Sequence, residues 1–275
     1  MDKISINDVI NIDYNHARKT IENFLANELE KSKRSGYVIG LSGGVDSATS
    51  YFLAAEAVGI DKVLALIMPD STVTPKEDVD DAKELVKILK GKVQIIDINP
   101  IVEVYKSTIP AYEEKDVVPL GNIRARIRMT LLYFYANKLS SLVLGTGDRS
   151  EETIGYFTKY GDGGVDVLPI STLLKSQVRR LAVNLGVPEK IAFKPSSPRL
   201  WSGQEAEKEL GVSYDTVDLI IYSIFDKKID IDVFVKNSGI NRAVVEMVLD
   251  MNKRSEHKRS LPSSLDVKSV IKYIA

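Results

Sequence analysis

The sequence predicts an α/β fold, with a parallel sheet that carries helices on both faces and a helical C-terminal part. Short apolar runs alternate with longer segments of helical periodicity from about residue 14 to residue 190. Strands and helices that alternate in this way form parallel sheets, because each helix returns the chain to the same end of the sheet. Beyond about residue 203 the sequence is almost entirely helical in pattern. We therefore expect one domain over residues 1–275, with an α/β core at about 14–190 and a helical part at about 203–275.

Periodicity and turn residues define the first predicted elements. Apolar side chains recur at helical spacing over residues 14–34, and the apolar run YVIGL at 37–41 reads as a buried strand. A second helix should cover 46–58 and end at Gly59, because glycine is favoured just beyond a helix C-terminus. The run VLALIM at 63–68 supplies the next strand.

Capping residues mark the next helices. In TPKE, Pro75 occupies a favoured first helical position, so we expect a helix from there to about Gly91. The run VQIIDI at 93–98 predicts a third strand. Asn99 and Pro100 then begin a short helix by the same reasoning.

The remaining segments predict one long helix, one strand and two further helices. Residues 122–139 are apolar nearly all round apart from their arginines, so we expect a helix that is buried on several sides. This pattern fits a central core helix and a subunit interface equally well. The run SLVLGTG at 141–147 predicts a fourth strand that ends in a loop. A helix is expected at 172–185, before Gly186, and a last helix is expected at about 265–274.

Composition and charge exclude several classes of protein. The 37 basic and 38 acidic residues leave a net charge of -1, which gives no general attraction to nucleic acid or to an anionic membrane. No apolar run approaches the length of a membrane span, and the N-terminus lacks the pattern of a signal peptide. We expect a cytoplasmic protein with no nucleic-acid or membrane partner. Because the chain has no cysteine, disulfides, thiolate metal sites and cysteine nucleophiles are excluded.

Three loops are expected at the carboxyl ends of the strands, where parallel sheets bind ligands, namely 42–47, 68–74 and 146–151. The first lies in GLSGGVDSATS, where Gly43 and Gly44 permit a tight turn and a close approach of the backbone to a ligand. The helix that follows directs unpaired N–H groups and partial positive charge at the same place. This combination predicts a phosphate site.

Asp46 is the unexpected member of this loop, because a carboxylate repels a bare phosphate. It fits the site if it holds Mg²⁺ that bridges to phosphate oxygens. The alternative is that Asp46 only caps the helix and that the glycines only turn the chain. The loop lacks both the Gly-Lys-Ser/Thr ending of the P-loop and the G-x-G-x-x-G of dinucleotide folds.

The motif SGGVDS after a strand resembles the signature of the PP-loop ATP pyrophosphatases, which cleave ATP between the α- and β-phosphates and adenylate a substrate. The block GTGDRSEETIGYFTKYGDGGVDVLPI at 145–170 resembles ammonia-dependent NAD synthetases, and so do GNIRARIRM at 121–129, KPSSP at 194–198 and EHKR at 256–259. This resemblance covers nearly all of the chain. It implies a homodimer with a Rossmann-like fold of the adenine nucleotide α-hydrolase type.

The resemblance also implies roles for individual residues. Asp46 and Glu151 are implied as Mg²⁺ ligands, and Asp46, Lys175 and Asp166 as catalytic residues. ATP is implied to bind at Gly40, Leu41, Ser42, Gly43, Gly44, Val45, Asp46, Ser47, Thr146, Lys175 and Ser197. The second substrate, deamido-NAD, is implied to bind at Arg126, Lys159, Asp166, His257 and Lys258.

The implied reaction has two steps. The nicotinate carboxylate of deamido-NAD attacks the α-phosphorus of ATP, while Mg²⁺ and Lys175 neutralise the departing pyrophosphate. Ammonia then attacks the acyl-adenylate to give NAD and AMP, and either Asp166 or Asp162 assists by taking a proton from ammonium. Glutamine-using domains rely on a catalytic cysteine, so we expect free ammonia as the nitrogen source unless a separate subunit supplies it.

Several alternatives stay open at the level of sequence. Arg124 and Arg128 share a helix face that Arg126 does not, so at least one of the three is expected to be structural. His257 fits an exposed helix end as well as a ligand. The loops 68–75 and about 195–210 are candidates for lids.

Competing functions are another PP-loop activity, such as that of GMP synthetase or a tRNA-modifying enzyme, and a nucleotide sensor that has lost turnover. A tRNA modifier should carry a basic surface or an RNA-binding module, and the net charge and the late segment predict neither. A sensor is expected to lack one of the groups that the reaction needs. Asp46, Glu151 and Lys175 are all present, which favours an enzyme.

Overall fold

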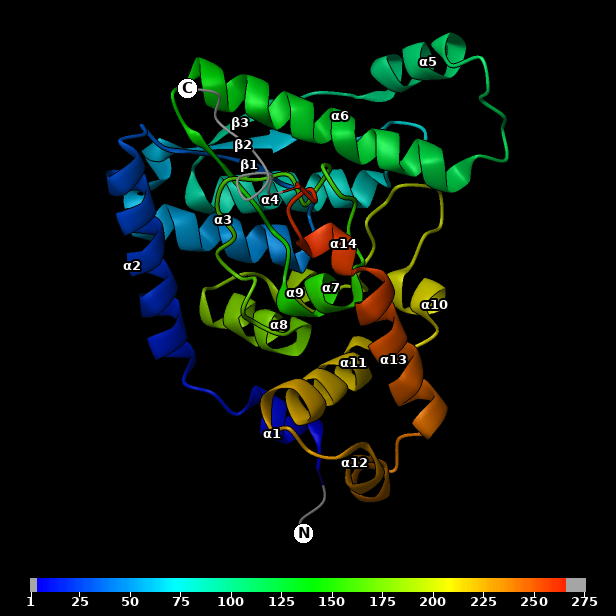
Figure 1. Ribbon diagram of the computed structural model, residues 1–275. Helices are drawn as coiled ribbons and strands as arrows, with labels where there is room; N and C mark the ends of the chain where they lie inside the picture. The colour runs from blue at the N-terminus through cyan, green and yellow to red at the C-terminus, as the bar shows by residue number, and fades with distance from the viewer. Residues whose placement is uncertain (1–3, 266–275) are drawn as a thin grey trace, which may run out of the picture.

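Four parallel strands form the sheet of this protein, whose computed structural model describes residues 4–265 (Figure 1). The strands are β1 (Tyr37–Gly40), β2 (Val63–Ile67), β3 (Lys92–Ile95) and β4 (Leu142–Leu144), in the spatial order β3-β2-β1-β4. The chain moves outward from β1 to β3 and then returns to place β4 on the other side of β1. Sheets of this kind bind ligands beyond the carboxyl ends of the strands where the order reverses. This reversal lies between β1 and β4.

Helices cover both faces of the sheet, which confirms the predicted fold class. One face carries α5 (Asn99–Thr108) and α6 (Val117–Lys138), and the other carries α3 (Val45–Val58) and α4 (Lys76–Leu89) (Figure 1). Because both faces are covered, the central strands are continuous apolar runs rather than alternating ones. On the side of α3 lie the further helices α2 (Tyr14–Ser32) and α8 (Lys175–Asn184), which pack on α3.

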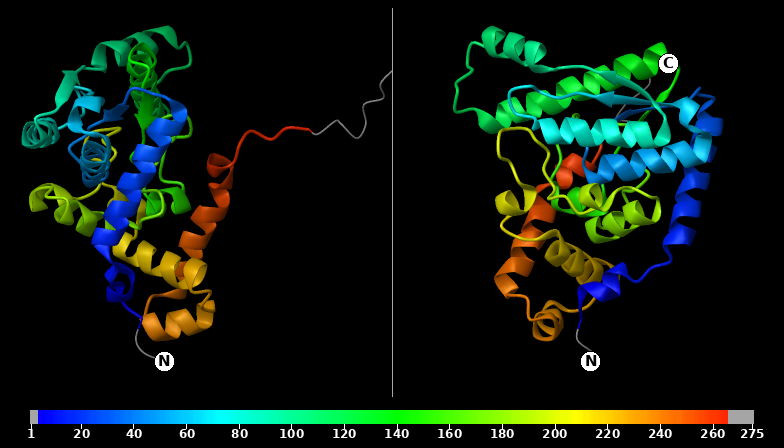
Figure 2. Two further views of the ribbon diagram at one scale, coloured as in Figure 1. Left: turned by 90° about the vertical axis from the view of Figure 1, so that its left-hand side faces the viewer. Right: turned by 180° about the vertical axis from the view of Figure 1, so that it is seen from behind.

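The helical part of the chain lies at the end of the molecule opposite α5 and α6 (Figure 2). Its own hydrophobic core is distinct from the two cores that flank the sheet. The elements are α1 (Ile6–Ile10), α10 (Ala206–Leu210), α11 (Tyr214–Ile220), the π-helical turn η2 (Ile221–Asp226), α12 (Ile231–Ser238), α13 (Arg242–Arg254) and α14 (Glu256–Arg259). This part is joined to the core by α11, which packs on α8 and on α7 (Arg149–Ile154). These contacts support the single-domain organisation, which stays a prediction.

Short helices complete the described elements, namely η1 (Ile60–Lys62) before β2 and α9 (Glu189–Ala192) after α8. For residues 4–265, none of the helices has both the length and the apolar character that a membrane span needs.

The structure corrects three of the predicted elements. Helix α6 is not buried on several sides, because it lies in an outer layer and leaves side chains such as Phe134 exposed. The helix expected from residue 172 begins at Lys175, after a turn in which Leu173 N donates to Ile170 O. Pro75 is the N-cap of α4 rather than its first residue. The helix expected at about 265–274 lies almost wholly outside the described residues.

Candidate active site

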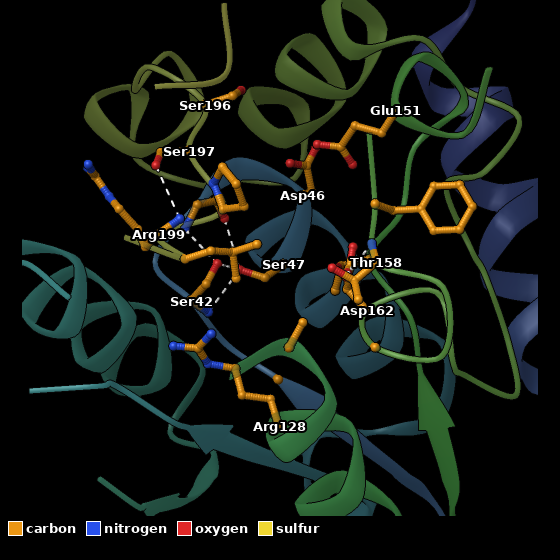
Figure 3. A pocket seen from close by; sticks show the side chains of 18 of the residues that line it. Ser42, Asp46, Ser47, Arg128, Glu151, Thr158, Asp162, Ser196, Ser197 and Arg199 are labelled. Atoms are coloured by element: carbon orange, nitrogen blue, oxygen red, sulfur yellow. Dashed lines mark hydrogen bonds between the residues drawn. The ribbon is translucent and has the colours of Figure 1, made fainter. Parts of the chain in front are cut away.

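A cavity of about 420 Å³ opens at the carboxyl ends of the strands, and this volume suits a small-molecule ligand. All three loops that the sequence places there contribute to its lining, through residues of 42–47, of 68–74 and of 146–151. Figure 3 shows Ser42, Asp46 and Ser47 of the first loop and Glu151 of the third. The rest of the wall comes from the segment 194–201, from residues of α6, and from residues of 155–165 and 204–209 together with Lys258. Loops that are far apart in sequence therefore meet in one site, as the strand order requires.

The loop between β1 and α3 depends on one glycine for its path. Gly43 has a φ of +80°, and a Cβ atom at this position would lie 2.2 Å from the backbone oxygen of Asp78 in α4. Only glycine combines this φ with so close an approach. Gly43 does not line the cavity itself, but it turns the chain so that its neighbours do.

Helix α3 begins directly after this turn, with Gly44 as its N-cap. Asp46 therefore lies within the first helical turn and is not the cap, so the alternative in which it only caps the helix is wrong. Ser42 and Ser47 hold the loop closed, since their Oγ atoms lie 3.0 Å apart and Ser42 Oγ accepts from Gly44 N at 3.2 Å. The loop presents the N-terminus of a long helix to the cavity, an arrangement that favours phosphate.

The side chain of Lys175 lies at the centre of a cluster of three carboxylates. Its Nζ is 2.6 Å from Asp46 Oδ2, 2.8 Å from Glu151 Oε1 and 2.9 Å from Asp148 Oδ2. Lys175 and Asp148 are fully buried, whereas Asp46 and Glu151 face the cavity and point toward one another (Figure 3). The ring of Tyr214 covers a further side of the ammonium, 5.0 Å from its centroid. Three carboxyl groups surround one ammonium, so full ionisation of all three would leave the cluster with an excess of negative charge.

The pKa values in this cluster show the same imbalance. Burial raises the pKa of Asp148 to about 7, although the charge of Lys175 opposes the shift. Burial also raises the pKa of Glu151 well above its ordinary value, again against the effect of Lys175. For Lys175 burial alone would lower the pKa, yet the three carboxylates outweigh it and the pKa lies well above its usual range. The ammonium therefore stays charged, and further positive charge is favoured here.

Asp46 and Glu151 fit the role of Mg²⁺ ligands. Both approach the same nitrogen of Lys175, so they are near enough to share one ion. Asp46 Oδ1 is buried and has no hydrogen-bond partner among the described residues, which leaves it available to a cation. Within residues 4–265 no group of three or more ligand side chains forms a ready-made metal cage. Two carboxylates suffice for Mg²⁺, which usually binds through one or two of them together with substrate phosphates.

The residues that the resemblance assigns to ATP fall into two groups. Most of them line the cavity, and two lie behind its surface. Gly43 and Lys175 do not line the cavity, because Gly43 packs on α4 and Lys175 lies behind Asp46 and Glu151. The others line it, namely Gly40, Leu41, Ser42, Gly44, Val45, Asp46, Ser47, Thr146 and Ser197.

Three of the residues assigned to deamido-NAD form a connected group outside the cavity lining. Arg126 Nη2 donates to Lys159 O at 3.2 Å, and Lys159 Nζ donates to the carbonyl oxygen of His257. His257 is exposed, as the alternative interpretation of this residue expects. Lys258 does line the cavity, but its Nζ also donates to Gly155 O at 2.7 Å. The substrate role of these residues stays a prediction.

Asp166 lies apart from that group and from the cavity lining. Its Oδ2 accepts from Val143 N at 2.8 Å, and its Oδ1 accepts from Tyr133 Oη at 3.0 Å. Both contacts tie the carboxylate to β4 and α6. Asp162, the alternative proton acceptor, does line the cavity, and its Oδ1 accepts from Thr158 N at 2.9 Å.

The three arginines of α6 separate as their spacing predicts. Arg124 is structural, because its buried guanidinium donates to Asp70 Oδ2 at 2.6 Å and to Leu200 O at 3.0 Å. Arg128 donates to Met68 O at 2.9 Å and lines the cavity, and burial lowers its pKa to about 10. Both therefore fix the second loop, and Arg124 also ties it to the wall segment at Leu200.

The wall segment 194–201 is held by charged contacts with α4. Lys194 Nζ lies 2.8 Å from Asp78 Oδ1 and also contacts Asp81, while Arg199 Nε lies 2.7 Å from Asp78 Oδ2. Trp201 is partly buried and lines the cavity. A lid role for this segment stays a prediction.

Sequence reasoning missed three residues that contact the charged cluster or its neighbours, namely Asp148, Tyr214 and Asp218. A signal for Asp148 was present, since Asp followed three residues later by Glu is an N-terminal helix pattern, and Asp148 does cap α7 by accepting from Glu151 N at 2.8 Å. Tyr214 and Asp218 come from the helical part, and no local pattern connects them with residue 175.

Comparison with known proteins agrees with this geometry. Residues 17–262 match the NAD synthase family. The chain is similar to the NH(3)-dependent NAD(+) synthetase of Aeropyrum pernix, with 56% identity over 98% of this chain and 96% of that protein. The protein of the same name from Hyperthermus butylicus is 53% identical over 96% of this chain and 95% of its own length.

Two solved structures extend the comparison to three dimensions. The NMN synthetase from Francisella tularensis has a TM-score of 0.82 at 34% identity and is covered in full by 93% of this chain. The NH3-dependent NAD synthetase from Campylobacter jejuni has a TM-score of 0.77 at 29% identity, with the same coverage. Residues, site geometry and relatives all lead to one assignment. This chain is an enzyme that belongs to the NAD synthase family, a family of carbon–nitrogen ligases.

Proposed function

We propose that this enzyme converts deamido-NAD, ATP and ammonia into NAD, AMP and pyrophosphate, with Mg²⁺ as the metal. The observation that carries the proposal is the meeting of Asp46 and Glu151 beside the glycine turn of β1 and α3. A phosphate site with its own pair of carboxylates is what metal-assisted attack at the α-phosphorus of ATP needs. A bare phosphate site needs no such pair.

The chain's own residues have separate tasks in the first step. The backbone around Gly44 and the N-terminus of α3 bind phosphate oxygens, and Ser42 and Ser47 keep that loop in shape. When bound, Mg²⁺ would be held by Asp46 and Glu151 and would supply charge neutralisation at the phosphates. Lys175 supplies a further fixed positive charge directly behind these carboxylates. Catalysis then consists of positioning and of charge stabilisation, with no protein nucleophile.

The second step needs a proton acceptor for ammonium. Asp162 is better supported than Asp166 in this role, because Asp162 lines the cavity and Asp166 is held against β4 and α6. Desolvation of the carboxyl group raises the pKa of Asp162, although the hydrogen bond from Thr158 N opposes the shift. A raised pKa strengthens a carboxylate as a base. Free ammonia is the nitrogen source that a chain without cysteine supports. The cytoplasmic location stays a prediction.

The size of the acid substrate is a further question, because one structural relative is an NMN synthetase. A mononucleotide acid and deamido-NAD share the reacting nicotinate carboxylate and differ in the adenylate half. Arg126 and Lys159 carry positive charge outside the cavity lining, which suits the additional phosphate of a dinucleotide that extends beyond the cavity. This arrangement supports the dinucleotide.

The test is a product assay with purified enzyme, ATP and Mg²⁺, with either deamido-NAD or nicotinate mononucleotide as the acid and either ammonium or glutamine as the nitrogen donor. We expect NAD and AMP from deamido-NAD and ammonium, and no product after metal removal by EDTA until Mg²⁺ is restored. ADP in place of AMP would contradict cleavage between the α- and β-phosphates. Product from glutamine alone would contradict the ammonia assignment, and a preference for the mononucleotide would contradict the dinucleotide.

We also propose that the enzyme is a homodimer. Large apolar side chains are exposed along α6 and the neighbouring α5, among them Val104 and Phe134, with exposed fractions of 62% and 57%. Such a surface is costly in water and is typical of a subunit contact. Sedimentation equilibrium should give twice the chain mass of 30.5 kDa, with the monomer mass recovered for Phe134→Asp. A wild-type enzyme that stays monomeric at micromolar concentration would contradict the dimer.

A further inference from the structure

Helix α11 directs one face toward Lys175, the residue at the centre of the charged cluster. Tyr214 and Asp218 are four residues apart, so they lie on the same side of the helix, and both are fully buried. The ring of Tyr214 covers the ammonium of Lys175, with 5.0 Å between Nζ and the ring centroid. Asp218 Oδ2 accepts from the backbone N–H of Ser176 at 2.7 Å. One side chain thus contacts the charged end of Lys175, and the other holds the backbone next to it.

Asp218 also connects α7 and α8, two of the three helices that carry the cluster. Its Oδ1 accepts from the hydroxyl of Ser150 in α7, and Ser150 Oγ accepts from Lys175 N at 2.9 Å. Ser150 precedes Glu151, and Ser176 follows Lys175. A single buried carboxylate therefore fixes the start of α8 and the helix that carries Glu151 relative to each other.

We propose that Tyr214 and Asp218 are positioning residues that act through Lys175. The inference rests on the catalytic role proposed above for Lys175. A lysine side chain is a point charge on a flexible stem, so its usefulness depends on what holds it. Here the carboxylates occupy its donors, an aromatic face covers another side, and Asp218 fixes the backbone from which the side chain extends.

A purely structural role is the alternative for Asp218. A carboxylate at the N-terminus of α8 stabilises that helix whether or not Lys175 takes part in catalysis. Two facts favour the positioning role. The ring contact and the carboxylate contact are independent, yet both converge on Lys175 and its backbone. In addition, Tyr214 Oη is buried with no hydrogen-bond partner among the described residues, so the ring is the part in contact with the site.

The test is a set of double-mutant cycles on the full-length enzyme. Asp218→Asn keeps the shape of the side chain and removes its charge, and Tyr214→Leu removes the ring. We expect kcat to fall about 10- to 100-fold for Asp218→Asn and about 10-fold for Tyr214→Leu, with the KM for deamido-NAD unchanged. Tyr214→Phe keeps the ring and should keep kcat. In a Lys175→Met background neither substitution should lower kcat further, because the group through which each acts is gone.

Asp226 supplies the matched control. It accepts from Arg149 of α7, as Asp218 accepts from Ser150 of the same helix, but it is partly exposed and lies at the far end of η2. Asp226→Asn should therefore leave kcat within about 2-fold. Equal falls in kcat with and without Lys175 would overturn the proposal by making the role structural.

Two further outcomes complete the test. If Lys175→Met alone keeps wild-type turnover, the catalytic role of Lys175 is wrong, and this result is distinct from a failure of coupling. If Asp218→Asn does not fold, as thermal unfolding followed by circular dichroism would show, Tyr214→Leu and Tyr214→Phe decide the question. Equal kcat for these two variants would then overturn the positioning role of the ring.

Discussion

Replacement of Lys175 by methionine is expected to lower kcat for NAD formation by about 10²- to 10³-fold, the usual effect of removing one charge-stabilising group from an active site. The physical reason is that Lys175 is the cation at the centre of the cluster, and its Nζ contacts Asp46, Asp148 and Glu151 within 2.9 Å. Without it, the carboxyl groups lose the cation that holds them together, and the charge of the leaving pyrophosphate loses a fixed positive neighbour. The KM for deamido-NAD should change little, and release of AMP followed by chromatography measures the rate.

Lys190 provides the control for this substitution. Its Nζ also contacts two carboxylates, Asp81 at 3.0 Å and Glu84 at 2.6 Å, but it lies in α9 and does not line the cavity. Lys190→Met should keep kcat near the wild-type value, because an exposed ion pair contributes little. A Lys175→Met enzyme with a kcat within tenfold of the wild type would contradict the role assigned to the ammonium.

The sequence predicts the fold and the place of the site well because both follow from local patterns. Strands such as β1 are continuous apolar runs, and helices such as α3 end at glycine, so neither depends on distant residues. The three loops then meet by the general rule that parallel strands end at one edge of the sheet. Boundaries follow less closely from the pattern. Helix α8 begins three residues later than expected, because residues 170–173 form a turn and the extended Leu174 is the N-cap.

The partners of each site residue are what the sequence could not supply. Lys175 lies 129 positions from Asp46 in sequence, and no periodicity records that their side chains meet. The roles of Tyr214 and Asp218 are also absent from the sequence pattern. They follow only from the packing of α11 on α8, which brings both side chains to Lys175 and its backbone. The sequence left open whether α6 packs in the core or against another subunit for a related reason, since an apolar helix has the same pattern in both places.

Substitution of Gly43 by alanine is expected to be among the most damaging single changes in the loop, and it tests whether the turn itself is needed for nucleotide binding. The added Cβ would lie 2.2 Å from Asp78 O, and backbone oxygens cannot move away as a flexible side chain can. The φ of +80° adds the cost of a left-handed conformation, about 1–2 kcal/mol. Together these effects should lower the free energy of unfolding by about 2–4 kcal/mol.

Gly59 allows the two costs of Gly43→Ala to be separated. Gly59 has a similar φ of +87°, but a Cβ there would meet nothing within 4 Å, and it ends α3 at the far end from the cavity. Gly59→Ala should therefore lose only a conformational part of the stability, about 1–3 kcal/mol because side chains other than glycine rarely adopt its backbone angles (φ 87°, ψ 139°), and keep its affinity for ATP. Gly43→Ala should in addition bind ATP about 100-fold more weakly, because the N-terminus of α3 is displaced from the phosphates. Isothermal titration with Mg²⁺ and ATP measures both affinities, and equal values for the two variants would show that phosphate binding does not depend on this turn.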